Sequence, residues 1–254
     1  MHKRTRMILV LVSLSMMFFS TISFASKESG QSDWEFNLAP FYLWGINIDG
    51  DMSVGPANAQ VEIPFEDVFD SLEAAFIVHF ETVYKAQWGF LVDVNYLDLE
   101  NKMNLPLGIG PKVGLNMTLA EFSGFYRLQR DAHAFDFIAG VRYIDVENTV
   151  SVGGGLTLHD GNKDWLDPLI GARWIWGFAD GWSLIARGDI GGFGIGSEFS
   201  WHALGVVEWQ PWKHASFIAG YRALDVDYED GSGKDYFNFD ATIHGPVLGL
   251  NFKW

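Results

Sequence analysis

The sequence predicts an all-β fold: a transmembrane, antiparallel, up-and-down β-barrel of ten strands, with eight or twelve strands as less favoured counts. Three observations predict it: a leader segment of the kind that directs export, a period-two alternation of apolar residues, and short turns that alternate with long links. Hydrophobic residues make up 48% of the 254 residues. After the leader, however, no segment stays apolar for the ~20 residues that a spanning helix needs.

The first 25 residues are predicted to form a signal peptide that is removed on export. Residues 3–6 include three basic side chains, and Met7–Phe19 is apolar apart from two serines. Small residues stand three and one positions before the expected cleavage point, which follows Ala25. The apolar stretch is too short for a membrane-spanning helix. Residues 26–254 are therefore expected to form the outer-membrane β-barrel domain.

The charge balance excludes some classes of partner. The leader holds three of the 17 Lys and Arg residues and none of the 32 Asp and Glu residues, so the mature chain would carry 14 basic and 32 acidic residues, a net charge of −18. Such a chain repels nucleic acid, which proteins bind largely through Lys and Arg. The sequence has no cysteine, which excludes disulfides and thiolate chemistry. No motif indicates a cofactor.

Alternation of residue types marks the strands. At the start of the mature chain, one face would carry Trp34, Phe36, Leu38, Pro40, Tyr42 and Trp44, and the other Glu35, Asn37, Ala39 and Phe41. Bulky, ring-rich residues opposite small or charged ones are typical of a strand with lipid outside and a polar lumen inside. Ten such segments are expected, at 34–46, 73–84, 88–101, 112–128, 133–148, 164–178, 182–194, 197–210, 214–228 and 236–254.

Short and long connections alternate between these segments. Tight turns are expected at 85–87, 130–131, 179–181 and 211–213, longer links at 47–72, 102–111, 149–163 and 229–235, and a glycine-rich link at 191–196. In outer-membrane barrels the short turns face the periplasm. An even strand count then places both termini in the periplasm. The predicted location is therefore the bacterial outer membrane.

Aromatic residues gather beside the short turns, where a membrane interface would lie. Trp and Tyr favour the headgroup region because the ring is apolar while its N–H or O–H stays hydrated. The interface set is Trp34, Tyr84, Trp88, Tyr126, Trp182, Trp209 and Trp254. Three strands of this chain contain similar five-residue segments towards their other end, and these segments finish at Asp98, Asp145 and Asp225. Each of these aspartates is expected to mark where its strand leaves the hydrocarbon.

Charged residues fall on the parity assigned to the lumen. Arginines and carboxylates in a narrow interior must pair, because an unpaired charge there is desolvated at high cost. The expected ion-pair network comprises Glu35, Glu81, Asp93, Glu121, Arg127, Asp136, Arg142, Arg173, Arg187, Asp189, Glu208 and Arg222. The network could fill a closed barrel or form the charged constriction of a pore. Inward Phe41, Leu91, Phe125 and Leu204 favour a filled interior.

Motifs for catalysis are weak. The sequence has no nucleophile elbow, no paired-histidine zinc motif and no phosphate-binding loop. Omptin-like proteases use extracellular Asp and His clusters, and His159-Asp160 falls in a predicted long link, but no matching acidic pair can be assigned. Lipid A deacylases would show a His-x-Ser pair, which the strand histidines His79, His202 and His244 lack. No catalytic residue and no metal site are assigned, although the acidic loops around Asp49 and Asp227 make divalent cations candidate partners.

Both ends of the mature chain carry a resemblance to a known family. The segment 42–45 (YLWG) with 49–51 (DGD), and the final segment 244–254 (HGPVLGLNFKW), resemble a family of uncharacterised bacterial (Gram-negative) outer-membrane β-barrel proteins. The resemblance implies fold and location, and no activity. The terminal Trp254 also resembles the carboxy-terminal signal that the barrel-assembly machinery reads. Expected partners are therefore this machinery, outer-membrane lipid and lipopolysaccharide.

These patterns predict a non-enzymatic outer-membrane barrel with a structural or surface-interaction role. The alternative is a narrow porin-like channel for small solutes. A surface hydrolase of the omptin or lipid A deacylase type is a third, less favoured hypothesis.

Overall fold

The structure, a computed structural model, describes residues 32–54, 57–99, 112–152 and 156–254. The predicted signal peptide and the predicted link at 102–111 lie outside these ranges. Among the residues that are described, no helix is long and apolar enough to cross a membrane.

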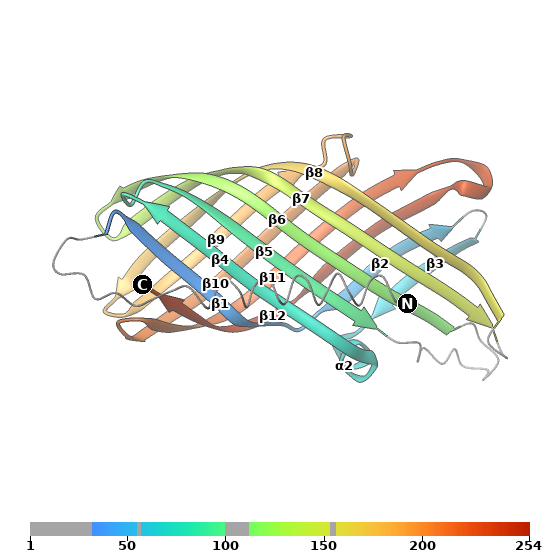
Figure 1. Cartoon of the computed structure of the whole chain (residues 1–254), viewed down its shortest axis with the longest axis horizontal. Coiled ribbons are helices and arrows are strands. Elements are labelled where there is room, and N and C mark those ends of the chain that lie inside the picture. Colours follow the sequence, from blue (N-terminus) through green and yellow to red (C-terminus); the bar gives the residue numbers. More distant parts are fainter. Residues whose placement is uncertain (1–31, 55–56, 100–111, 153–155) are drawn as a thin grey trace. The chain divides into compact units, whose positions relative to one another are not determined.

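Ten antiparallel strands close into a barrel, so the predicted fold class and strand number are confirmed (Figure 1). Each strand pairs with the next in the chain, and the first pairs with the last. Period-two sequences form these strands because successive side chains point to opposite faces of a sheet. The strands are β1 (Trp34–Trp44), β4 (Leu72–Tyr84), β5 (Trp88–Leu99), β6 (Lys112–Arg130), β7 (His133–Val152), β8 (Leu156–Ala179), β9 (Trp182–Gly191), β10 (Phe199–Trp212), β11 (Ala215–Asp230) and β12 (Phe237–Lys253).

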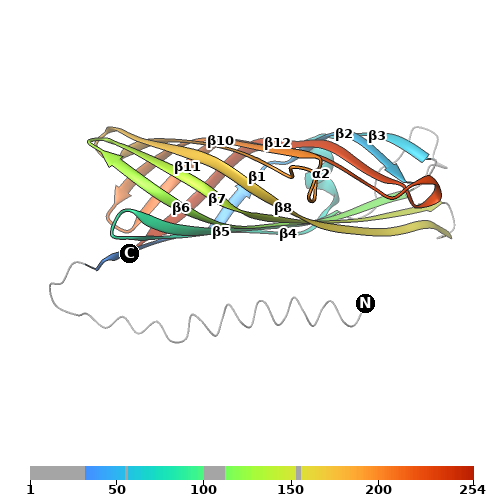
Figure 2. The same cartoon turned by 90° about the horizontal axis from the view of Figure 1, so that it is seen from above.

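The two ends of the barrel differ. One end, here called the turn end, carries the tight turns at 85–87, 131–132, 180–181 and 213–214, and the C-terminus (Figures 1 and 2). The opposite end is called the loop end. The last turn was predicted at 211–213, but β10 continues through Pro211 and Trp212, and the turn falls on Lys213 and His214. Lys85, Ala86 and Asp131 have positive φ angles, as tight hairpins often require.

The prediction of a loop at 47–72 is wrong. This segment forms β2 (Asn47–Val54), β3 (Ala57–Ile63) and the helix α2 (Phe65–Ser71). β12 is long enough to pair with β2 over residues 237–244 and with β1 over residues 247–253, so β2 continues the wall that β1 begins. β3 pairs with β2. Two acidic residues stand in the first turn of α2, where the helix dipole favours negative charge.

Other predicted links are shorter than expected. β7 and β8 form one long hairpin, so most of the predicted link at 149–163 is strand. His159 and Asp160 consequently belong to β8 rather than to a loop. β11 runs to Asp230 and is followed by a 3-10 helix, η1 (Gly233–Asp235). Longer hairpins satisfy more backbone hydrogen bonds than open loops would, which favours the extension.

A β-bulge changes the parity of β1. The pairing with β12 shifts between Leu38 and Phe41, a stretch that contains Pro40, which cannot donate a backbone hydrogen bond. Beyond the bulge Leu43 is 71% exposed, while Tyr42 and Trp44 are buried. The prediction that Tyr42 and Trp44 face outward is therefore wrong. The predicted inward side chain of Phe41 lies outside the described residues.

The strands of the barrel do not all extend equally far towards the loop end. β9 and β10 stop at a turn over residues 192–198, and β8 and β11 continue beyond it (Figure 1). There Trp165 of β8 stacks on Tyr228 of β11, with ring centroids 3.8 Å apart and planes 8° apart. Lys163 and Asp230 form an ion pair of 2.6 Å across the same gap. Side chains thus close the wall where hydrogen-bonded strands do not.

Candidate functional site

The interior of the barrel has three layers along its axis. A cavity of about 320 Å³ lies towards the turn end, and its lining includes Glu35, Asn251 and Lys253. A network of charged side chains follows in the middle. An apolar core then fills the loop-end part. The middle layer is the candidate functional site, because it gathers the buried charged side chains of the interior.

One half of the network joins two arginines to two carboxylates. Arg127 donates two parallel hydrogen bonds to the carboxylate of Asp136, of 2.7 Å from Nε and 2.9 Å from Nη2. Arg173 donates to the same carboxylate at 2.7 Å and also to Glu81 at 3.0 Å. Both guanidinium groups lie over the ring of Phe125, at 5.3 and 5.0 Å from its centroid. Fork-like arginine contacts of this kind are the stronger, geometrically specific form of ion pair.

The other half is built around Asp189. Arg142 donates to this carboxylate at 2.7 Å and to Glu121 at 3.1 Å through the same nitrogen. Arg187 donates to Asp189 from Nε at 3.1 Å. His202 places Nδ1 2.9 Å from Asp189, while its Nε2 accepts a hydrogen bond from Arg222 at 3.1 Å. This pattern fixes His202 as the neutral tautomer protonated on Nδ1.

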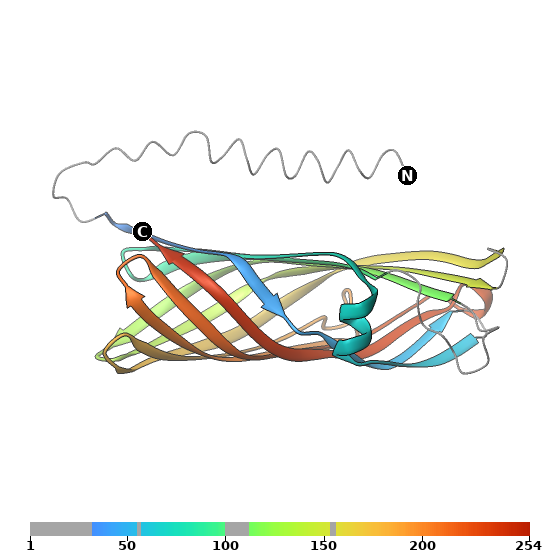
Figure 3. The same cartoon turned by 90° about the horizontal axis from the view of Figure 1, so that it is seen from below.

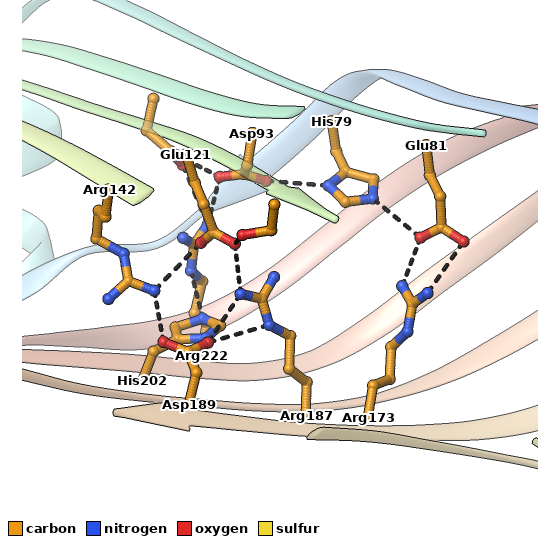
Figure 4. Close-up of polar contacts among 12 residues, drawn as sticks. His79, Glu81, Asp93, Glu121, Arg142, Arg173, Arg187, Asp189, His202 and Arg222 are labelled. Atoms are coloured by element: carbon orange, nitrogen blue, oxygen red, sulfur yellow. Dashed lines mark hydrogen bonds and ion pairs between the residues drawn. The ribbon is translucent and has the colours of Figure 1, made fainter. Parts of the chain in front are cut away.

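Arg222 and His79 connect the two halves across the lumen (Figure 4). Arg222 donates to Asp93 at 3.1 Å, and its guanidinium lies 4.5 Å from the centre of the Trp44 ring. His79 lies 3.2 Å from Asp93 and 3.9 Å from Glu81. The network is therefore continuous from wall to wall, and its side chains come from β4 to β11.

The network is balanced in charge and largely buried, and one side of it lines the cavity. Arg142 is 1% exposed, and the other members are also buried apart from the partly exposed Arg127 and His79. Five arginines meet five carboxylates: Arg127, Arg142, Arg173, Arg187 and Arg222 with Glu81, Asp93, Glu121, Asp136 and Asp189. Because each desolvated charge has a partner, the arrangement avoids the penalty of an isolated buried ion.

Two of the predicted lumen residues lie outside this network. Glu208 sits nearer the turn end, where Lys253 and Ser216 both contact it at 2.6 Å. Glu35 is exposed and lines the cavity, and no ion pair among the described residues includes it. Lys253 was not predicted to belong to the lumen. In the last strand it belongs to the alternate positions that hold small or charged residues. The alternation could therefore have identified Lys253 as a lumen residue.

The loop-end interior is apolar, which sequence reasoning missed. Inward residues there include Leu97, Ile144 and Ile243, all buried. The outward residues at the same level are acidic, among them Asp98 and Asp225. Nearer the turn end, apolar residues lie outside, and the charged network lies inside next to a small buried apolar cluster of Val83, Leu91, Phe125, Ile138 and Leu169. The loop-end part is thus built as a water-exposed β-structure with its own hydrophobic core.

The aromatic residues predicted at the interface lie on the outer surface near the turns. Trp34 and Tyr84 pack with centroids 4.8 Å apart, and Trp88 and Tyr126 at 4.6 Å. Further around the barrel, Trp182 and Trp209 stack at 5.7 Å. Trp254 stacks on Phe36 at 5.7 Å, and the two residues exchange backbone hydrogen bonds that close the barrel.

A second polar cluster lies on the outer surface. His244 of β12 lies between Asp49, at 2.7 Å from Nε2, and the Tyr221 hydroxyl, at 2.6 Å from Nδ1. Each residue comes from a different strand, so the cluster ties β2, β12 and β11 together. Within the described ranges, no group of three or more His, Asp or Glu side chains is arranged to hold a metal ion.

Comparisons with known proteins support the fold alone. No protein-family model matches the sequence, and no curated protein matches it. Among solved structures, the outer-membrane protease OmpT of Escherichia coli is similar, with a TM-score of 0.53, 10% identity, and coverage of 90% of this chain and 99% of that chain. OprG of Pseudomonas aeruginosa gives a TM-score of 0.36 at 13% identity, covering 89% of this chain and 98% of that chain. The chain has the fold of bacterial outer-membrane β-barrel proteins.

Proposed function

We propose that this protein is a non-enzymatic component of the bacterial outer membrane, whose closed barrel supports a rigid, acidic β-structure at the cell surface. The observation that carries the proposal is the filled interior. The ion-pair network spans the lumen, and the apolar core lies directly beyond it. Ions do not cross a dry apolar layer without a large desolvation cost.

The outer surface supports the proposed location and orientation. Apolar side chains such as Phe122 and Leu248 are exposed between the turn-end aromatics and the acidic loop-end surface. That order matches a lipid-facing band flanked by an aromatic girdle. Short turns lie on the periplasmic side of such barrels. We therefore place both termini in the periplasm and the loop end outside the cell, with lipopolysaccharide around the barrel and Trp254 available to the assembly machinery.

The role at the surface is structural or one of interaction. The histidines of the lumen, His79 and His202, line the cavity, and their ring nitrogens are bonded within the network. The loop-end surface offers carboxylates from several strands, including Asp51, Asp227 and Asp240, which lie directly opposite one another across β2, β12 and β11. A rigid surface of this charge would favour cationic partners.

Cysteine labelling on intact cells tests the orientation, because the chain has no cysteine of its own. Ser232→Cys, at the exposed loop end, should react with a membrane-impermeant maleimide. Asp180→Cys, in an exposed turn at the other end, should react only after the outer membrane is permeabilised. The reverse pattern would overturn the orientation, and labelling of both sites on intact cells would overturn the membrane location.

A narrow channel is the second candidate. The observation in its favour is the polar cavity of about 320 Å³ on the turn-end side of the network. A channel would require the network and the core beyond it to part. The rate at which proteoliposomes swell in solutions of small sugars separates the two candidates. With a closed barrel, this rate should equal that of liposomes without protein, whereas a channel should increase the rate.

A further inference from the structure

Two segments project from the barrel wall and expose large apolar side chains. In α2, Phe65 is 43% exposed and Phe69 65% exposed. In the turn between β9 and β10, Phe193 is 46% exposed and Ile195 76% exposed. Neither segment is itself a strand of the wall. Exposed apolar clusters that a fold does not cover commonly mark an interaction surface.

The helix is held firmly in place. Val68 is buried in the loop-end core, and the backbone N–H of Phe65 donates to the side chain of Asn47 at 2.9 Å. Gly45 leaves room for the Phe65 ring, since a Cβ at Gly45 would lie 3.3 Å from it. The rings of Phe65 and Phe69 pack with centroids 5.9 Å apart. Their exposure is therefore a fixed feature of the fold.

The turn between β9 and β10 is held just as firmly. Ser197 donates to the buried Asp167 through its backbone N–H at 2.7 Å and through its hydroxyl at 2.8 Å. Ile195 donates to the carbonyl of Gly192 at 3.0 Å. Phe193 has a φ of +53°, a conformation that is uncommon for a side chain of this size. The anchored loop thus keeps Phe193 and Ile195 on the outside despite a backbone cost.

The two segments lie at the same position along the barrel axis. Figures 1 and 3 show α2 and the β9–β10 turn at the same distance from the turn end, and Figure 1 shows them on opposite sides of the barrel. At this level the outer surface changes from apolar to acidic: Leu166 is exposed on β8, whereas the next outward residue towards the loop end is Asp164. Both segments therefore mark one plane, the plane at which the outer surface becomes polar.

We propose that α2 and the β9–β10 turn form a two-sided anchor that inserts into the leaflet on the loop-end side. The occupant is lipid: Phe65, Phe69, Phe193 and Ile195 would lie among the upper acyl chains, and Glu66, Asp67 and Asp70 of α2 would remain at the headgroups. This inference rests on the proposed membrane location and adds the depth of immersion. The surface is continuous with the lipid-facing band, which argues for lipid rather than a protein partner. Two anchors on opposite sides would also limit tilting of the barrel.

Site-directed spin labelling of the refolded full chain in phospholipid vesicles tests the anchor. Single-cysteine variants Phe69→Cys and Ile195→Cys carry the nitroxide label, and depth is measured from accessibility to oxygen against a water-soluble nickel chelate. Ala203→Cys, on the lipid-facing side of β10, and Ser232→Cys, at the loop end, are the matched controls. All four positions lie on the surface, so circular dichroism should show the same β-structure in each variant.

The expected result is a graded series. The label at Ala203 should be deepest and that at Ser232 fully aqueous, while those at Phe69 and Ile195 should share one shallow depth inside the lipid. A deep Ala203 label with aqueous labels at Phe69 and Ile195 would overturn the anchor alone. An aqueous Ala203 label would overturn the membrane proposal itself. Markedly different depths at Phe69 and Ile195 would contradict the shared plane.

Discussion

Trp165 stacks on Tyr228 at the place where β9 and β10 have already ended, and the pair closes the barrel wall there without a strand. The Trp165 indole N–H also donates to Ser197 at 2.8 Å, so the stack is joined to the turn below it. Both rings are buried in the core that fills the loop-end part. The closure of the upper barrel therefore depends on side-chain packing rather than on the backbone.

Replacing Trp165 with alanine should lower the free energy of unfolding by about 3–5 kcal/mol, the usual cost of removing a large buried aromatic. Urea unfolding of the refolded protein in lipid measures it. Trp165→Phe keeps a ring in place and loses the hydrogen bond, so it should cost clearly less. Equal costs for the two variants would show that the stack does not close the wall.

Removing Arg173 should also destabilise the barrel. The substitution Arg173→Ala leaves the buried carboxylates of Asp136 and Glu81 with fewer partners, and stranding a buried charge costs about 3–5 kcal/mol. The matched control is Lys163→Ala, which breaks the more exposed ion pair with Asp230 and should cost at most about 1 kcal/mol. If the two variants unfold at the same urea concentration, the lumen is more hydrated than the network implies.

The acidic loop-end surface predicts a stability that depends on pH. Burial and the neighbouring carboxylates Asp240 and Glu198 raise the pKa of Asp227 above its ordinary value. The folded state thus holds the proton more tightly than the unfolded state. Stability should therefore fall as the pH rises from the ordinary Asp value of about 3.9 through the raised pKa.

The substitution Asp227→Asn removes this titration and should make the protein more stable at neutral pH. Urea unfolding at a series of pH values checks it, with Asp180→Asn in the exposed turn as the control. A variant that loses stability at neutral pH would show that Asp227 makes a favourable contact instead.

The lipid-facing parity can be tested on β10. Ala203 is exposed on the outer surface, so Ala203→Arg should cost about 2–4 kcal/mol of stability in a bilayer. Ser232→Arg, at the loop end, should have little effect. The difference should shrink in a loose detergent micelle, where water reaches the surface. An unchanged unfolding curve for Ala203→Arg would place this face away from lipid.

Much of the barrel could be predicted because lipid on one face imposes a strict alternation. All ten strands were found, and the arginines and carboxylates that meet in the network stand on the alternate positions that the sequence assigns to the lumen. Which arginine meets which carboxylate depends on strand register, which the alternation does not determine. The predicted outward orientation of Tyr42 and Trp44 was wrong because a single bulge between Leu38 and Phe41 reverses the facing of the later positions in β1.

The elements between β1 and β4 were missed for a different reason. Ile48, Gly50 and Met52 alternate with acidic or polar residues in β2, but the acids suggested a solvated loop. The helix α2 has only seven residues, too few for a clear periodic signal. The apolar loop-end core was missed because alternation does not reveal which of two faces meets water. Leu97 and Leu99, for example, occupy the same inward-facing alternate positions as Asp93, but they lie beyond the network. At that level the outer surface of the barrel is acidic.

Single-channel recording in a planar bilayer tests the central claim, that the interior is closed, most directly. The purified, refolded protein should give no conductance steps, because the network from Arg142 to Asp93 and the core beyond it leave no continuous water path. Arg173→Ala, which opens the network next to the cavity, should be less stable and should still give no conductance steps, because the apolar core beyond the network stays in place. Stable conductance steps from the wild-type protein, with an Arg173→Ala variant of unchanged stability, would contradict the closed barrel and favour the channel.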